Sequence, residues 1–116
     1  MLIEIQGLPP MANGGHGSWQ KSHGIRKAWK TRVGNMLLGK VPRTPYQLIH
    51  VIFTRHSSSE PDYDGLVHGF KPVRDALVNF GIVIDDDSTH MRSEYRWCKA
   101  KAKEGKITIE ITPITE

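Results

Sequence analysis

The spacing of apolar residues along the chain predicts alternating strands and helices. Residues 2–7 (LIEIQG) alternate apolar and polar side chains, which is typical of a strand with one buried face. Residues 25–40 carry apolar side chains at helical spacing, and Gly39 is a suitable residue to end that helix. Residues 46–56 are almost continuously apolar or β-branched, which predicts a strand in the centre of a sheet.

The second half of the chain continues this alternation. Residues 71–81 are predicted to form a helix with Pro72 in its first turn and Gly81 at its end. Its inner stripe would consist of Phe70, just before the helix, and Val73, Leu77 and Phe80. The remaining segments are a short strand at 82–85, a hairpin at 93–111 that turns near Glu104 and Gly105, and loops at 8–24 and 57–65. The order β-α-β-α-β-β predicts an α+β fold, with two helices on one face of a mixed sheet.

Length and composition predict a single domain over residues 1–116. One core can form in 116 residues, and a single cysteine, Cys98, excludes an internal disulfide bond. No apolar run approaches the roughly 20 residues that cross a membrane, and the N-terminus lacks the features of a signal peptide. We therefore expect a soluble, cytoplasmic protein without a membrane partner.

Charge is distributed unevenly along the chain, whose net charge is +4. Residues 1–59 hold eight lysines or arginines and one acid, whereas residues 60–87 hold seven acids and only two basic residues. A basic surface around an acidic centre suits a nuclease, because the bases attract phosphates and the acids hold metal ions. A solvated basic surface without a nucleic-acid partner is the alternative.

The acids form two clusters that flank the helix predicted at 71–81. Asp62 and Asp64 stand two residues apart, so their side chains would leave an extended segment on the same face. Asp85, Asp86 and Asp87 follow the predicted strand at 82–85. Both clusters would emerge at one edge of the sheet and hold Mg²⁺ through carboxylate oxygens. The alternative is that these acids form turns and helix N-caps.

The stretch from Asp62 to Ser88 resembles the signature of the RusA family of Holliday junction resolvases. The family pattern runs D-x-D-N, a lysine, D-A-L, a glycine and then D-D. It is found here at Asp62, Asp64, Lys71, Asp75-Ala76-Leu77, Gly81 and Asp85-Asp86. Residues 8–13 (LPPMAN) are similar to the Pro-Pro-x-x-Asn opening of the family.

The resemblance implies a homodimeric endonuclease that depends on Mg²⁺, with Mn²⁺ as a possible substitute, and nicks four-way DNA junctions symmetrically. By position, Asp62, Asp64 and Asp86 would be the catalytic, metal-binding acids, with Asp85 as a further ligand and Lys71 as the catalytic lysine. The sequence departs from the pattern twice. Gly65 replaces the usual asparagine, and in the compact form of the motif His68 rather than Lys71 would occupy the place of the lysine.

Several other residues are candidates for contact with DNA or for structural roles. The candidates for DNA contact are Arg26, Lys27, Lys30, Arg32 and Asn13. A solvated helix face is the alternative for the four basic residues, and a turn is the alternative for Asn13. Asp75 is expected to be an ion-pair or capping partner, with Lys71 or Arg74, rather than a metal ligand. Two other functions stay open: a non-catalytic DNA-binding module, and a Mg²⁺-dependent phosphohydrolase that acts on nucleotides.

Overall fold

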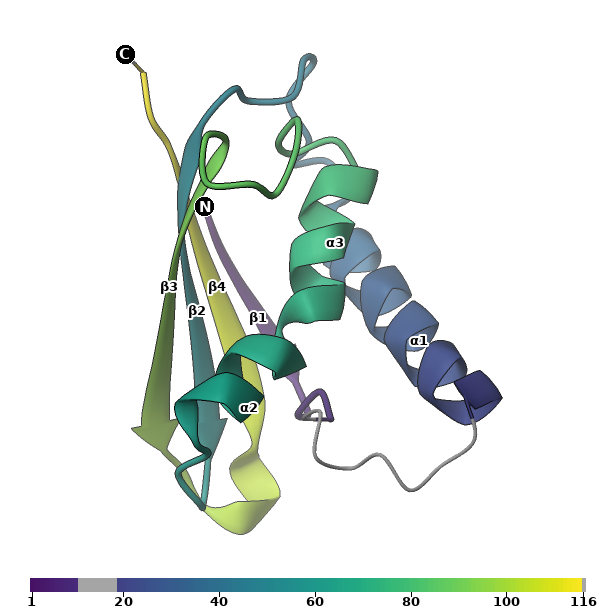
Figure 1. Ribbon diagram of the computed structural model, residues 1–116, viewed down its shortest axis with the longest axis vertical. Coiled ribbons are helices and arrows are strands. Elements are labelled where there is room, and N and C mark those ends of the chain that lie inside the picture. The colour runs from purple at the N-terminus through teal and green to yellow at the C-terminus, as the bar shows by residue number, and fades with distance from the viewer. Residues whose placement is uncertain (11–18, 116) are drawn as a thin grey trace.

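One mixed sheet of four strands organises the protein (Figure 1). The computed structural model describes the backbone of residues 1–10 and 19–115, and within this range the side chains of residues 1–10 and 24–115. The strands are β1 (Leu2–Gln6), β2 (Ile49–Ser57), β3 (Met91–Lys99) and β4 (Lys106–Pro113), and their order in the sheet is β1-β4-β2-β3. Strand β4 is antiparallel to both of its neighbours, whereas β2 and β3 are parallel. This arrangement confirms the predicted α+β fold and the central position of β2.

All the α-helices that the structure describes cover the same face of the sheet (Figure 1). They are α1 (Trp19–Leu37), α2 (Tyr63–Gly69) and α3 (Lys71–Asn79), and a short 3-10 helix, η2 (Ala102–Glu104), precedes β4. Helix α1 begins earlier than residue 25, inside a segment that was predicted to be a loop. Helix α2 was not predicted, because its seven residues are too few to show a helical repeat.

The core lies between the sheet and the helices. Strand β2 buries Ile49, Val51 and Phe53 on its inner face, and a run of isoleucines from β1 and β4 flanks them. Helix α1 contributes side chains four residues apart, and α3 contributes a stripe from its first two turns; they are Trp29, Val33, Leu37, Val73, Ala76 and Leu77. The apolar spacing therefore marks most of the faces that the elements bury. The exception is Phe80, which was expected on the inner stripe but follows the last residue of α3 and is 43% exposed.

The end of α3 is closed by a Schellman motif around Gly81. The amide of Ile82 donates to the Leu77 carbonyl at 2.9 Å, and the amide of Gly81 donates to the Val78 carbonyl at 3.1 Å. Gly81 has φ +86°, a value that side chains with a Cβ atom adopt only at a cost. Pro72 lies in the first turn of α3, as predicted.

Two predictions about the last third of the chain are wrong. Strands β3 and β4 do not form a hairpin, because each pairs with a different edge of β2. Residues 82–85 do not form a strand, since only Val83 makes a single parallel bridge, to Tyr46. Both segments have the local sequence pattern of strands, but this pattern does not specify which strand each one pairs with. Strand β2 has two edges with free backbone hydrogen-bonding groups, and β3 and β4 each pair with one of them.

The Schellman motif predicts opposite effects for two glycine-to-alanine substitutions. Gly81→Ala should lower the free energy of unfolding by about 1–2 kcal/mol, because alanine would be forced into the left-handed region. Gly24→Ala lies inside α1, where no described atom beyond the neighbouring helix backbone comes within 4 Å of the new Cβ, and it should raise stability by up to about 1 kcal/mol. Urea denaturation of both variants measures this difference, and equal effects of the same sign would contradict the proposed role of Gly81.

Candidate functional site

A shallow hollow between α1, α3 and the segment before β3 gathers three carboxylates. Its volume is about 320 Å³, and its lining residues are Lys30, Asp75, Val78, Asn79, Asp85 and Asp86. We call it the acidic hollow. Asp75, Asp85 and Asp86 belong to the sequence signature, and the fold brings them together from two separate segments.

Asp75 lies between two lysines from different helices. Its carboxylate oxygens are 3.8 Å from Lys30 Nζ of α1 and 3.6 Å from Lys71 Nζ, one turn earlier on α3. These pairs are partly solvated, so each contributes little to stability. The expected role of Asp75 as an ion-pair partner of Lys71 is confirmed, and the charge of Lys71 is directed to Asp75.

Arg74 holds the acidic segment against α3. Its Nη2 donates to the Asp86 carbonyl oxygen at 3.0 Å and lies 3.7 Å from Asp86 Oδ2. Its Nε is buried and has no hydrogen-bond partner within the described part of the chain. The sequence pattern indicates Arg74 only as a partner of Asp75. The signal that could have indicated more is its position three residues after Lys71, which places both on neighbouring parts of the α3 surface.

Tyr95 of β3 connects Arg74 to the first acidic cluster. Its ring stacks on Phe53 at a centroid distance of 5.3 Å, and Tyr63 approaches it edge-on at 6.4 Å. Burial among these rings raises the pKa of Tyr95, and the nearby charge of Arg74 partly opposes this shift. Tyr63 is the residue between Asp62 and Asp64, so the aromatic cluster reaches the first turn of α2.

Each of the three consecutive aspartates accepts a hydrogen bond or forms an ion pair with a different partner. Asp85 Oδ1 accepts a hydrogen bond from the Asp86 amide at 2.8 Å, and Asp86 pairs with Arg74. Asp87 Oδ1 accepts from the hydroxyl of Thr89 and from its amide. The hydrogen bond from the Thr89 hydroxyl lowers the pKa of Asp87, which therefore stays ionised.

The first acidic cluster differs from the expectation in two ways. Asp62 is the N-cap of α2, where its Oδ1 accepts a hydrogen bond from the Gly65 amide at 3.0 Å, and Asp64 lies in the first helical turn. The segment is therefore not extended, and the turn-and-cap alternative is correct for Asp62. The two clusters also do not emerge at one edge of the sheet. Asp62 follows the last residues of β2, whereas Asp86 precedes β3, which begins beside the first residue of β2.

The acidic hollow contains carboxylate oxygens, the type of donor atom that magnesium prefers. Carboxylate oxygens are the ligands that Mg²⁺ takes, often through one or two carboxylates with several waters retained. Within residues 1–10 and 24–115, no three His, Cys, Asp or Glu side chains are close enough to hold a metal ion. The ligand set of Asp62, Asp64, Asp85 and Asp86 therefore stays a prediction.

The four basic residues of α1 have different surroundings. Arg26 and Lys27 are exposed, and neither makes an ion pair with any side chain that the structure describes. Lys30 pairs with Asp75, and Arg32 stacks on Trp29 at 4.3 Å while donating to the Gln6 carbonyl. Arg32 thereby fixes α1 to the end of β1. Asn13 lies outside the described residues.

His68 and Lys71, the two candidates for the family lysine, lie on two different helices. Helix α2 ends at Gly69 and α3 begins at Lys71, with Phe70 between them. His68 is exposed in the last turn of α2, and the Lys71 side chain is 57% exposed. Both side chains are accessible, and the choice between them as the family lysine stays open.

Comparisons with known proteins add no assignment. No family model matches the chain, and no curated protein matches it. Within the described residues, no helix combines the length and the apolar character needed to cross a membrane.

Asp62 allows a cap and a charge to be tested separately. Asp62→Ala should lower the free energy of unfolding by about 1 kcal/mol, because the Gly65 amide loses its acceptor. Asp62→Asn keeps a good N-cap and should leave stability within a few tenths of a kcal/mol of the wild type. Chemical denaturation compares the two variants. Equal losses in both would show that the charge of Asp62, rather than its capping geometry, stabilises α2.

Tyr95 should make stability sensitive to alkaline pH. Its pKa is raised in the folded protein, so the unfolded chain loses the phenolic proton first as pH increases above about 10. Its contribution to stability is therefore complete below that pH and is lost above it. The free energy of unfolding should fall more steeply above pH 10 in the wild type than in Tyr95→Phe. Parallel pH profiles would contradict this assignment.

Proposed function

We propose that the protein is a Mg²⁺-dependent endonuclease that resolves four-way DNA junctions. The observation that carries the proposal is the acidic hollow, where Asp75, Asp85 and Asp86 of the signature meet Lys30. The resemblance of residues 62–88 to the junction-resolvase signature supports the choice of reaction and substrate. The basic residues Arg26 and Lys27, on the exposed side of α1, add a surface that suits phosphates.

Residues of the acidic hollow, together with Arg74 and Lys71 beside it, would each have a separate role in phosphodiester hydrolysis. Asp85 and Asp86 would hold Mg²⁺, which lowers the pKa of an attacking water and stabilises charge on the phosphoryl oxygens. Arg74 orients Asp86 through its main-chain and side-chain contacts. The ammonium groups of Lys30 and Lys71 lie beside Asp75, where they can neutralise negative charge on a bound phosphate.

A homodimer would complete the proposed activity. A four-way junction requires two symmetry-related cuts, and a two-fold dimer supplies two equal sites. In each copy, Asp62 and Asp64 lie exposed at the start of α2, apart from the acidic hollow. We propose that they act on the same DNA as the hollow.

A non-catalytic DNA-binding module is the second candidate function. The observation that favours it is that several acids already have structural partners: Asp62 caps α2, Asp75 pairs with two lysines and Asp86 pairs with Arg74. In such a module the acids would have only a structural role, through these contacts, and would bind no metal ion.

Cleavage of a synthetic four-way junction, labelled on each strand in turn, tests the proposal. We expect paired nicks at symmetric positions with Mg²⁺ and none with EDTA. Asp86→Asn should lower the cleavage rate by about 100-fold or more, the loss seen when a group that stabilises transition-state charge is removed. Asp87→Asn is the matched control, because Asp87 carries the same charge but hydrogen-bonds Thr89. It should cleave at close to the wild-type rate.

The possible results separate the candidate functions. Junction binding without nicks, in Mg²⁺ and in Mn²⁺, would favour the DNA-binding module. Hydrolysis of nucleotides that junction DNA does not inhibit would favour a phosphohydrolase. Equal losses of cleavage rate in Asp86→Asn and Asp87→Asn would show that the acidic hollow has no specific role in the reaction.

A further inference from the structure

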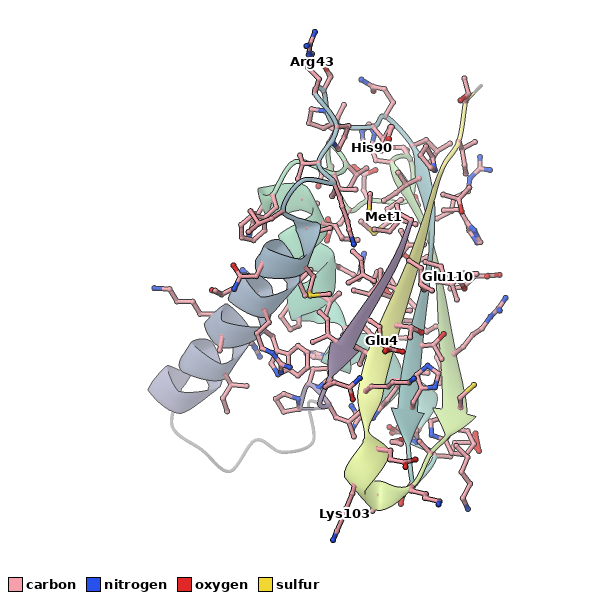
Figure 2. The ribbon with its side chains drawn as sticks, turned by 180° about the vertical axis from the view of Figure 1, so that it is seen from behind. Met1, Glu4, Arg43, His90, Lys103 and Glu110 are labelled. Atoms are coloured by element: carbon pink, nitrogen blue, oxygen red, sulfur yellow. The ribbon has the colours of Figure 1, made fainter. Side chains whose placement is uncertain are left out.

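A second hollow, of opposite charge, lies where β3 connects to β4. Its volume is about 490 Å³, and it is lined by three lysines, Lys99, Lys103 and Lys106, together with His56 and Gln6. Glu104 is the one acid in its lining. We call it the basic hollow. Figure 2 shows Lys103 at the end of the sheet, in the turn that precedes β4.

The lysines of the basic hollow are only partly neutralised. Residues 99–106 read KAKAKEGK, with four lysines and one acid. Lys106 Nζ is 2.8 Å from Glu4 Oε1, but Lys99 and Lys103 make no ion pair with any described side chain. Lys99 and Lys103 therefore line a concave surface in which positive charges outnumber the single acid, Glu104, and such a surface attracts an anion.

The pKa of His56 is sensitive to the positive charge in the basic hollow. It extends from the uncovered face of β2, and its Nε2 lies 3.2 Å from the Thr108 hydroxyl. Burial lowers the pKa of His56, and the neighbouring charge of Lys106 lowers it further, against a smaller opposing effect of Glu4. A phosphate bound in the hollow would offset the charge of Lys106, so the pKa of His56 should rise on binding.

The backbone holds this basic segment in place at both ends. The Ala100 amide donates to the Ser57 carbonyl at 2.9 Å, and the Gly7 amide donates to the Gly105 carbonyl at 2.8 Å. Gly105 also packs closely on Leu8, leaving no room for a Cβ atom. Because the lysine backbone is already ordered by these contacts, a ligand needs to order only the side chains.

We propose that the basic hollow binds the phosphates of a DNA strand. Lysines at 99, 103 and 106 present several separate ammonium groups, which suits a chain of phosphates better than one small anion. The hollow lies at the end of the sheet where β2 finishes and the chain continues to α2 (Figure 1). A strand held here would pass the end of the sheet that also carries Asp62 and Asp64. The inference shares with the proposed function the choice of DNA as ligand, but it does not depend on cleavage.

Binding of the full chain to a short labelled DNA duplex, in EDTA and over a range of salt concentrations, tests this inference. The variant Lys99→Gln/Lys103→Gln removes the two unpaired cations. It should bind more weakly, and its slope of log affinity against log salt should be smaller by about 1.8, since each phosphate contact contributes about 0.9. Lys40→Gln/Arg43→Gln is the matched control, because it removes the same charge from exposed positions outside the hollow. It should keep the wild-type slope.

The imidazole of His56 gives a second readout that a general loss of charge would not produce. By NMR, adding the duplex should raise the pKa of His56 in the wild type and the control, but not in Lys99→Gln/Lys103→Gln. Competition with inorganic phosphate distinguishes the ligands. Displacement of the duplex at equal phosphate concentration would indicate a site for a small anion and overturn the DNA assignment.

The result can be separated from the outcome of the cleavage test. Equal affinity and slope in the two double variants would overturn the basic hollow, even if the wild type cleaves junctions. Weaker binding only in Lys99→Gln/Lys103→Gln would support the hollow, even if no cleavage occurs. A wild-type chain that binds no duplex would overturn this inference directly.

Discussion

The parallel pairing of β2 with β3 is the constraint on which the rest of the structure depends. Parallel neighbours begin at the same end of a sheet, so the chain that leaves β2 at Ser57 must travel back before β3 begins at Met91. Helices α2 and α3 make this return, and their apolar faces cover the inner side of the sheet. The same connection separates Asp62, just after β2, from Asp86, just before β3. The fold that buries the core therefore also divides the acids.

The acidic hollow results from a second contact, which joins α3 to the segment before β3. Arg74 on α3 reaches the carbonyl and carboxylate of Asp86 and brings the segment before β3 onto the helix. Asp85 and Asp86 thereby come to line the same hollow as Asp75 and Lys30. An arginine can make both contacts at once because its guanidinium presents several donors in a fixed plane. The hollow thus depends on one side chain more than on the strand ends that the sequence pattern emphasised.

The two hollows of opposite charge lie in different parts of the structure. The acidic hollow lies among the helices, whereas the basic hollow lies beyond the end of the sheet, between β3 and β4. The net charge of +4 conceals this division, because charges of both signs cancel in the sum. At physiological ionic strength fields are screened beyond about 8 Å, so a nearby phosphate responds to the local hollow rather than to the net charge.

The sequence by itself determined the fold class, the central strand β2, the main helices and the ends of α3. These features depend on apolar spacing and on local residues such as Pro72 and Gly81, whose effects act within a few positions. Only the tertiary structure decided which strands are neighbours, because β3 and β4 have the same local pattern whether they pair with each other or with β2. It also decided that Asp75 and Asp86 share a hollow while Asp62 caps a helix elsewhere. Spacing along the chain restricts where a side chain can lie, but long-range pairing and the reach of Arg74 fix where it does lie.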